Sequence, residues 1–359
     1  MSTKKRTIDA FFGTPKSKKP RSEAIVDNAI PAASSTHPAY PFPIPHLPAS
    51  LSAELASAPG TTGTGTGRAI SDKPDLDLLY FEPYTPRLTA EELFRFLRAE
   101  LPFYRVEYDI QRGGISTHIR TPRWTTVFGI DATSRFASSS NNDGDSNEGA
   151  LHIVDARTSA RVLVGAPGSK DEGDRYYAKH LPRPIPKCLD DLRRSVEAAT
   201  GCDFNFCLVN YYASGADSIS YHSDDERFLG PMPAIASFSL GARRDFLMKH
   251  KPTAAGAAAP LHRNGIVKEK GKETAIIKPL KLPLGSGDMI LMRGPTQANW
   301  LHSIPKRSGK NEHDGGRINI TFRKAMVKGG TENYYNYNVG AGPVYRWDSV
   351  NREMKQWNP

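Results

Sequence analysis

One histidine and one aspartate stand two residues apart in the segment SYHSDDE, at positions 222 and 224. On an extended strand, residues i and i+2 point to the same face, so His222 and Asp224 could reach one metal ion together. His302, in the distant segment ANWLHSIPK, is the candidate for a third ligand. Two imidazoles and one carboxylate occupy one face of an Fe(II) ion and leave the opposite positions open for a cosubstrate and oxygen.

The segment RINITFR carries a second set of residues whose spacing suits a site. Arg317 and Arg323 share one face of a predicted strand, and Asn319 lies between them on that face. Two guanidinium groups that face a β core are costly unless anions meet them, and a dicarboxylate cosubstrate would do so through bidentate pairs. Two plainer interpretations stay open at this point: a chance His-x-Asp pair, and an outer strand with solvated arginines.

The composition of the chain favours an anionic partner. The chain has 359 residues, a formal net charge of +10 and a hydrophobic content of 38%. These values indicate nucleic acid as the partner, and disordered segments beside one large domain or two ordinary ones. Three cysteines without a CxxC pair argue against a disulfide framework or a zinc finger and suit a reducing compartment. No apolar run approaches the length of a membrane span, so we expect no membrane partner, and we expect a monomer.

The first half of the chain contains the elements that must surround these residues. Residues 1 to about 75 are basic and then rich in Pro and Gly, and we expect them to be disordered. A helix with a capping box of Thr89 and Glu92 should follow, then a β-hairpin that turns at Gly113-Gly114. After a flexible insertion at 138–149, a second helix should end at Gly201.

The second half of the chain has the pattern of strands. Gly, Pro and charged loops separate six short apolar segments, at 204–212, 234–241, 244–251, 276–284, 288–294 and 317–325. A β core preceded by helices predicts a mainly β sandwich, jelly roll or barrel with helices packed outside.

Four segments together resemble the AlkB family of Fe(II)- and 2-oxoglutarate-dependent nucleic-acid dealkylases. They are LVNYYASGADSISYHSDDE, PAIASFSLGARRDF, LPLGSGDMILMRGPTQANWLHSIPK and GRINITFRKA, and they occur in the family's order. The resemblance covers about residues 80–327 and looks closest to the eukaryotic homologues that repair alkylated bases. It implies a double-stranded β-helix (jelly roll) core at 203–326 within a dioxygenase domain at 76–327. An aromatic-rich extension at 328–359 follows, which we expect to pack against the jelly roll.

The resemblance also implies roles for individual residues. His222, Asp224 and His302 match the ligands of Fe(II). Asn210 and Tyr212 match polar contacts to 2-oxoglutarate, Arg317 matches the arginine that binds a carboxylate of this cosubstrate, and Asn319 and Arg323 match its neighbours. O₂ is the second cosubstrate that the family uses.

Three further residues are candidates for contacts with a base. Glu226 matches an acid that reads a flipped base, and a carboxylate there would favour the cationic N1-methyladenine and N3-methylcytosine. Asp225 either contacts the base or orients Glu226 or an arginine. Arg123 falls in a strand that borders the pocket, so it could contact the substrate. The alternative is that Arg123 is an ordinary residue at the base of the hairpin. The expected stacking aromatic has no clear position, since Phe136 is the lone candidate, and the hairpin tip QRGG shows no apolar wedge.

The N-terminal segment predicts a partner and a compartment. Ile8, Phe11 and Phe12 have the spacing of a sliding-clamp binding box, with Lys5 at the usual glutamine position. KSKKPR at 16–21 is typical of a nuclear localisation signal, and a solvated basic tail is the alternative for both.

The sequence therefore predicts a nuclear enzyme that oxidatively demethylates alkylated DNA bases. RNA or protein side chains as substrates, and a non-catalytic nucleic-acid or clamp adaptor, are the alternatives. The complete ligand set and both arginines argue against the adaptor.

Overall fold

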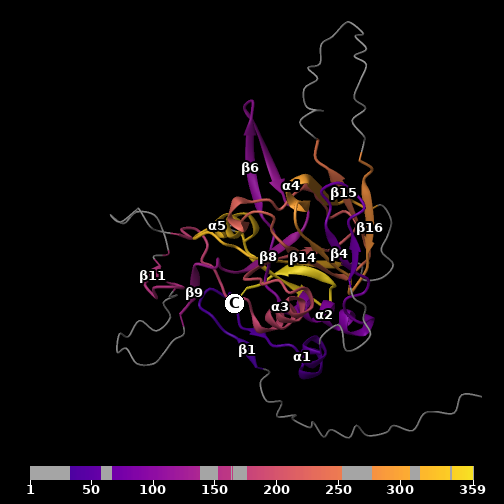
Figure 1. Cartoon of the computed structure of the whole chain (residues 1–359). Helices are drawn as coiled ribbons and strands as arrows, with labels where there is room; N and C mark the ends of the chain where they lie inside the picture. Colours follow the sequence, from indigo (N-terminus) through magenta and orange to yellow (C-terminus); the bar gives the residue numbers. More distant parts are fainter. Residues whose placement is uncertain are drawn as a thin grey trace, which may run out of the picture. The chain divides into compact units, whose positions relative to one another are not determined.

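Two antiparallel β-sheets make up the centre of the molecule (Figure 1). The computed structural model describes residues 33–57, 67–137, 153–162, 164, 176–252, 277–307, 316–339 and 342–358, in a unit that begins at Ala33. The larger sheet has the order β21 (Glu353–Gln356), β20 (Val344–Asp348), β5 (Phe103–Tyr104), β8 (Trp124–Gly129), β12 (Phe206–Tyr212), β19 (Arg317–Arg323), β14 (Ile235–Gly241), β17 (Met289–Met292), β4 (Leu78–Phe81), β3 (Arg68–Ile70). The smaller sheet has the order β13 (Ile219–His222), β18 (Trp300–Ile304), β15 (Arg244–His250), β16 (Leu280–Leu284).

The two sheets enclose an apolar core between them. Phe246 and Met248 of β15 belong to one buried cluster with Tyr212 of β12 and Ile290 of β17. The predicted mainly β architecture, a jelly roll with flanking helices, is confirmed.

Alternation along β19 explains how one strand serves both a core and a site. Ile318, Ile320 and Phe322 are fully buried in the apolar cluster on the helix side of the sheet. Residues of a strand alternate between faces, so Arg317 and Arg323 point to the other side, toward the smaller sheet. The predicted common face of the two arginines is therefore confirmed.

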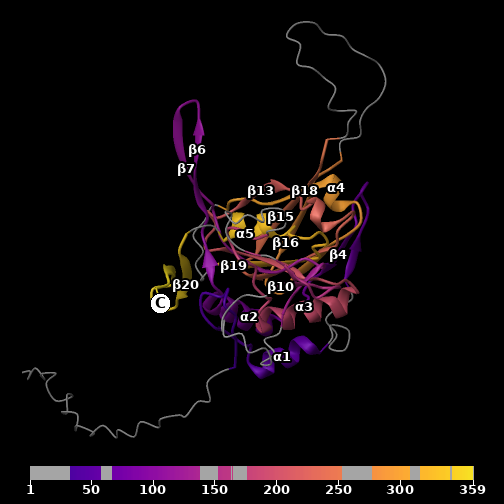
Figure 2. The same ribbon diagram turned by 90° about the vertical axis from the view of Figure 1, so that its left-hand side faces the viewer.

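Three helices lie on the outer side of the larger sheet, two of them nearer to it and the third packed beneath these two (Figure 2). They are α1 (Ala49–Ala56), α2 (Arg87–Glu100) and α3 (Lys187–Thr200). Leu51 of α1, Leu93 of α2 and Leu192 of α3 share one buried cluster with Ile320 of β19. This layer backs the strands that carry the candidate site, and it agrees with the expectation that helices pack outside the β core.

The prediction of disorder up to residue 75 is wrong for residues 33–57 and 67–75. Ile44 is fully buried, Leu51 is almost so, and the hydroxyl of Tyr40 donates to the carbonyl of Pro184 at 2.8 Å. The Pro-rich composition concealed a short helix whose leucines are buried against α3. Residues 1–32 lie outside the described structure, and so do residues 138–152, which include the predicted insertion.

The two long helices begin and end for different reasons. The expected capping box is wrong, because α2 begins at Arg87 after Pro86, and Thr89 lies inside the helix with its hydroxyl bonded to Glu54 of α1. The predicted end of α3 is confirmed, because Gly201 has a left-handed φ of 68°. Proline suits a helix start, since the first amide groups of a helix have no intrahelical partner.

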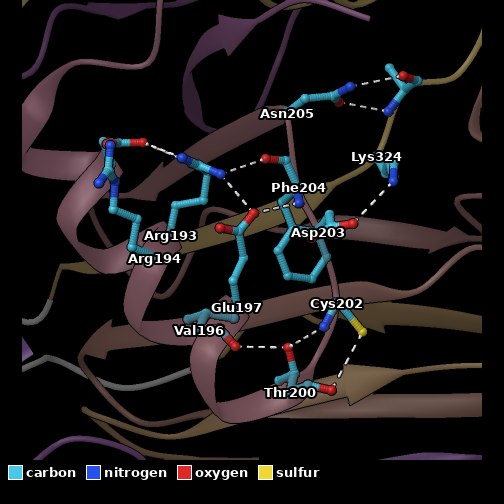
Figure 3. Close-up of polar contacts among 12 residues, drawn as sticks. Arg193, Arg194, Val196, Glu197, Thr200, Cys202, Asp203, Phe204, Asn205 and Lys324 are labelled. Atoms are coloured by element: carbon cyan, nitrogen blue, oxygen red, sulfur yellow. Dashed lines mark hydrogen bonds and ion pairs between the residues drawn. The ribbon is translucent and has the colours of Figure 1, made fainter. Parts of the chain in front are cut away.

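A polar junction joins α3 to the first central strand (Figure 3). Arg193 Nη1 donates to Glu197 Oε1 at 2.6 Å and to the carbonyl of Phe204 at 2.9 Å, and the amide of Phe204 donates to the same Glu197 oxygen at 2.6 Å. Asn205 exchanges two hydrogen bonds with Ala325, at 3.0 and 2.8 Å. These bonds fix the start of β12 beside the end of β19, which keeps the two strands in register.

A hairpin and a C-terminal extension complete the fold. β6 (Glu107–Arg112) and β7 (Ile115–Arg120) project from the body as a two-stranded ribbon, and the predicted turn at Gly113-Gly114 is confirmed (Figures 1 and 2). After β19, helix α5 (Glu332–Asn338) packs on β8, and β20 and β21 extend the larger sheet beyond β5. The C-terminal extension therefore contributes strands as well as aromatic packing.

The remaining elements are short. They are β1 (Ser34–Ser35), β2 (Ile44–Pro45), β9 (Ser134–Phe136), β10 (Ile153–Asp155), β11 (Arg161–Val162), α4 (Thr296–Asn299) and the 3₁₀ turn η2 (Arg227–Leu229). Within the described ranges, none of the helices has the length and apolar character needed to cross a membrane.

Candidate functional site

The predicted metal ligands come together at the edge of the smaller sheet. β13 pairs with β18 so that His222 stands opposite His302, and Asp224 follows β13 by two residues. His222 Nε2 lies 3.9 Å from Asp224 Oδ1, and His302 Nε2 lies 3.7 Å from Asp224 Oδ2. One ligand atom from each residue lies within 4.8 Å of the others. This spacing suits three atoms that face a single ion.

Neighbouring groups fix the orientation of each ligand. His222 Nδ1 must donate its proton to the carbonyl of Ser220 at 2.8 Å, which leaves the lone pair of Nε2 for a metal. The ring of Phe246 stacks on His302 with centroids 5.2 Å apart. The amide of Asp224 donates to Gln297 Oε1 of α4 at 3.0 Å.

The charges of the ligands also suit a divalent ion. Burial lowers the pKa of His302 to about 3, so its imidazole is neutral at physiological pH. Burial alone would raise the pKa of Asp224, but the charge of Arg323, whose Nη2 lies 2.9 Å from Asp224 Oδ2, holds that pKa below its usual value. Two imidazoles and one carboxylate are the donor set expected for Fe(II), so the residues present fit the metal.

A cavity of about 380 Å³ opens beside these ligands, between the two sheets. Its lining joins residues from both sheets, the hairpin and α5. They are Val106, Tyr108, Thr121, Arg123, Leu208, Asn210, Tyr212, Ile219, His222, Ser223, Asp224, Glu226, Ser237, Phe246, Met292, His302, Ile304, Asn319, Thr321, Arg323, Tyr334, Tyr337 and Asn338.

Arg317 is a candidate for an anion-binding group, and it lies behind the residues that line the cavity, next to the lining residue Tyr212. The side chain of Arg317 is 1% exposed, and Nη2 donates to Ser239 Oγ at 2.9 Å. Among the described residues, its Nε and Nη1 have no hydrogen-bond partner. Burial lowers the pKa of Arg317 to about 10, so the guanidinium stays charged at neutral pH. A buried cation with unused donors fits the carboxylate of a bound 2-oxoglutarate.

The other predicted cosubstrate contacts lie around Arg317. On β12 and β19, Tyr212 stands opposite Arg317 and Asn210 stands opposite Asn319. Asn319 Nδ2 donates to Ser237 Oγ at 2.9 Å and to the carbonyl of Phe238 at 3.0 Å. Asn319 therefore has partners within the protein, whereas Arg317 keeps two nitrogens for a ligand.

The candidates for base contacts divide into two groups. Arg123 lines the cavity and its Nε donates to Asn210 Oδ1 at 2.8 Å. Glu226 also lines the cavity. Asp225 is not among the residues that line the cavity, and its carboxylate pairs with Lys251 Nζ at 2.7 Å, so a base contact by Asp225 stays a prediction. Neighbouring residues in a turn point in different directions, which sequence adjacency does not reveal.

Helix α5 and the hairpin bring aromatic side chains that the sequence analysis did not assign to the site. Tyr334 and Tyr337 line the cavity from α5, and Tyr108 lines it from β6. Phe136, the candidate considered for stacking, lies instead in β9 beside His37, with ring centroids 5.4 Å apart. The segment TENYYNYN was the available signal. Its interpretation as packing holds for the fully buried Tyr335, and Tyr334 packs against Phe206 while it also lines the cavity.

The hairpin tip also differs from the expectation. Ile115 directly follows the two glycines and is 69% exposed. The ribbon therefore carries an exposed apolar side chain near its tip. The expectation missed it because it considered only the segment QRGG, which ends at Gly114.

Comparisons with known proteins agree with this geometry. A family model described as the 2OG-Fe(II) oxygenase superfamily matches residues 144–323. The chain is 36% identical over 143 residues to DNA oxidative demethylase ALKBH2 of Arabidopsis thaliana. It is 37% identical over 146 residues to DNA oxidative demethylase ALKBH2 of Homo sapiens, and 39% identical over 150 residues to alpha-ketoglutarate-dependent dioxygenase alkB homolog 3 of Homo sapiens.

The match to the Arabidopsis protein covers 40% of this chain and 44% of that relative. The match to human ALKBH2 covers 41% of this chain and 49% of that relative, and the match to human alkB homolog 3 covers 41% and 46%. The chain thus spans about half the length of the curated relatives that it matches, or slightly less. The expected resemblance to AlkB homologues is confirmed over this part. With its ligand cluster and the matched residues 144–323, the chain belongs to the 2OG-Fe(II) oxygenase superfamily, whose members use Fe(II), 2-oxoglutarate and O₂.

Proposed function

We propose that this chain is an Fe(II)- and 2-oxoglutarate-dependent dioxygenase that demethylates N-alkylated bases in DNA. The observation that carries the substrate class is a second carboxylate in the cavity. Glu226 lines the same cavity as the three metal ligands, and its Oε2 is buried without a hydrogen-bond partner among the described residues. Two of the curated relatives are named DNA oxidative demethylases, which supports the same class.

A buried carboxylate oxygen selects for a cationic partner. N1-methyladenine and N3-methylcytosine carry a positive charge at neutral pH, and each has an exocyclic amine that can donate to a carboxylate. The undamaged bases are neutral, so they gain less from Glu226. This difference would favour damaged over undamaged bases, because charge-assisted hydrogen bonds are about twice as strong as neutral ones.

Different residues of the site would bind the metal, the 2-oxoglutarate and the base. His222, Asp224 and His302 would hold Fe(II), and the unused nitrogens of Arg317 would bind a carboxylate of 2-oxoglutarate. When bound, iron with 2-oxoglutarate and O₂ supplies the oxidation that converts an N-methyl group to N-hydroxymethyl, with succinate and CO₂ as co-products. The hydroxymethyl group then leaves as formaldehyde and a proton, which restores the base.

Access to this site requires an unpaired base. The cavity lies between two sheets, so a base within a duplex must be flipped out before it can enter. The net charge of +10 favours contact with the phosphate backbone, while the carboxylate inside favours the lesion.

Formaldehyde release tests this proposal directly. Oligonucleotides with one N1-methyladenine or one N3-methylcytosine, as DNA and as RNA, are incubated with enzyme, Fe(II) and 2-oxoglutarate. We expect release from DNA by the parent and none by Asp224→Ala. Release from RNA alone would make the chain an RNA demethylase. Absence of release from both, with succinate formed on a protein substrate, would point to a protein hydroxylase, and absence of all turnover to an adaptor.

We also propose that the chain is a nuclear monomer that binds a sliding clamp through Ile8, Phe11 and Phe12. These residues and the basic segment 16–21 lie outside the described residues, so the proposal rests on their sequence. Light scattering of the purified protein tests the monomer. Imaging of a fluorescent fusion with and without residues 16–21 tests the compartment.

A further inference from the structure

Helix α5 contributes to the site although it follows the residues that the family model matches. The model ends at residue 323, and α5 spans Glu332–Asn338. We infer that Tyr334 is a positioning residue, which holds Glu226 so that one oxygen of its carboxylate faces the base. This inference deepens the proposed function and rests on it for the identity of the ligand.

The contacts of Glu226 leave its two oxygens in different states. The hydroxyl of Tyr334 donates to Oε1 at 2.6 Å. Oε2 is buried, and the described residues provide no hydrogen-bond partner for it. One oxygen is thus held by Tyr334, and the other has no donor among the described residues. A lost hydrogen bond would release the first oxygen and allow the carboxylate to rotate.

Arg323 is the group toward which a released carboxylate would turn. Its Nη2 already pairs with Asp224 Oδ2 at 2.9 Å, while the structure shows no partner for its Nε and Nη1 among described residues. The Cζ atom of Arg323 lies 4.9 Å from the centre of the Tyr334 ring. Tyr334 therefore contacts both charged groups.

The position of Tyr334 is fixed by the helix that carries it. Thr125 Oγ1 of β8 donates to the carbonyl of Asn338 at 2.6 Å, and the hydroxyl of Tyr335 donates to the carbonyl of Gly129 at 2.7 Å. The ring of Tyr334 meets that of Phe206 edge to face, with centroids 5.2 Å apart. A side chain with anchored backbone and packed ring can hold a partner in one orientation, which suits a positioning role.

Binding measurements on a matched set of variants test this inference. The dissociation constants of a single-stranded DNA with one N1-methyladenine and of the same DNA unmodified are compared, and their ratio measures the preference for the lesion. Tyr334→Phe keeps the ring and removes the hydroxyl, and it should reduce the preference about tenfold or more. Glu226→Gln should reduce it similarly, and the double variant should be no worse than Glu226→Gln alone, because both changes remove one coupled unit.

Two further variants separate positioning from general damage. Tyr84→Phe removes another buried hydroxyl, which bonds to Ser195 at 2.8 Å in the helix layer, and it should keep the parent's preference. Tyr334→His retains a ring and a hydrogen-bond donor, so it should recover part of the preference for the lesion. The same variant tests the inference if Tyr334→Phe does not fold.

The outcomes distinguish this inference from the proposed function. An unchanged preference in Tyr334→Phe, or additive losses in the double variant, would overturn the role of Tyr334. So would a parent that shows no preference for the methylated DNA. A parent that prefers the lesion but releases no formaldehyde would reject demethylation, while the binding comparison would still decide whether Tyr334 positions Glu226.

Discussion

Replacement of Arg317 by methionine should make the protein more stable and unable to bind its cosubstrate. Arg317 is buried, and its pKa falls from the ordinary value of arginine to about 10, chiefly because burial disfavours the charged form. One pKa unit corresponds to about 1.4 kcal/mol, so keeping this guanidinium charged costs about 3 kcal/mol. Because neutral pH lies below the lowered pKa, the whole cost is present there. Methionine has a similar length and no charge, so Arg317→Met removes the cost.

The expected size of the effect follows from the size of the domain. A gain of about 3 kcal/mol in the free energy of unfolding should raise Tm by about 5 °C in the absence of 2-oxoglutarate. Addition of 2-oxoglutarate at about 100 times its Kd should stabilise the parent by a similar amount. Arg317→Met should show almost no such ligand-dependent rise. Thermal melting with and without 2-oxoglutarate, at constant Fe(II) or Mn(II), measures both effects in one experiment.

Arg244 provides the matched control for this prediction. It is also a buried arginine, but it donates to the carbonyls of Ser214, Asp217 and Pro305, at 3.2, 2.8 and 2.6 Å. Arg244→Met leaves these three acceptors without their donor, so it should lower Tm. If Arg317→Met lowers the Tm of the cosubstrate-free protein as Arg244→Met does, the bond from Arg317 to Ser239 outweighs the burial cost and the reasoning is refuted.

Asp224→Ala should abolish formation of succinate and reduce Fe(II) affinity at least tenfold, measured by isothermal titration; parental affinity in the variant would exclude Asp224 as a ligand. Glu226→Gln should lower kcat/KM on cationic methylated bases about tenfold and on neutral etheno adducts much less. An equal loss on both kinds of lesion would mean that Glu226 supports the local structure instead. Phe11→Ala combined with Phe12→Ala should remove binding to the sliding clamp in a pull-down and leave demethylation of a short oligonucleotide intact, and equal clamp binding by the parent and the variant would rule out this segment.

The parts of the site that follow a strand period could be predicted from the sequence. Arg317, Asn319 and Arg323 share a face because strand residues alternate. His222 and Asp224 do lie close together as their spacing predicts, but only His222 is in a strand, since β13 ends there and Asp224 lies two residues beyond it. The distant His302 could be predicted as a ligand only from the order of the family's motifs, since no local sequence pattern links it to β13. The pairing of β13 with β18, which places the two histidines opposite each other, is visible only in the structure.

The rest of the site depends on tertiary contacts that a sequence does not encode locally. Tyr334 and Tyr335 are adjacent and chemically identical, yet one lies at the cavity and the other in the core, because α5 presents them on different faces. Asp225 and Glu226 separate in the same way at a turn. The helix α1 was missed because its surroundings have the composition of a disordered region, and its few leucines become informative only when α3 is present to bury them.

The position at which the described fold begins sets a length scale for clamp binding. A chain extends by at most about 3.5 Å per residue, so the stretch between Phe12 and Ala33 can span no more than roughly 70 Å. Had the folded unit begun near residue 76, the same limit would have been roughly 220 Å. A clamp bound through Phe11 and Phe12 would therefore confine the active site to DNA within a few helical turns of the clamp, so lesions would be searched along the DNA that the clamp encircles rather than on distant DNA.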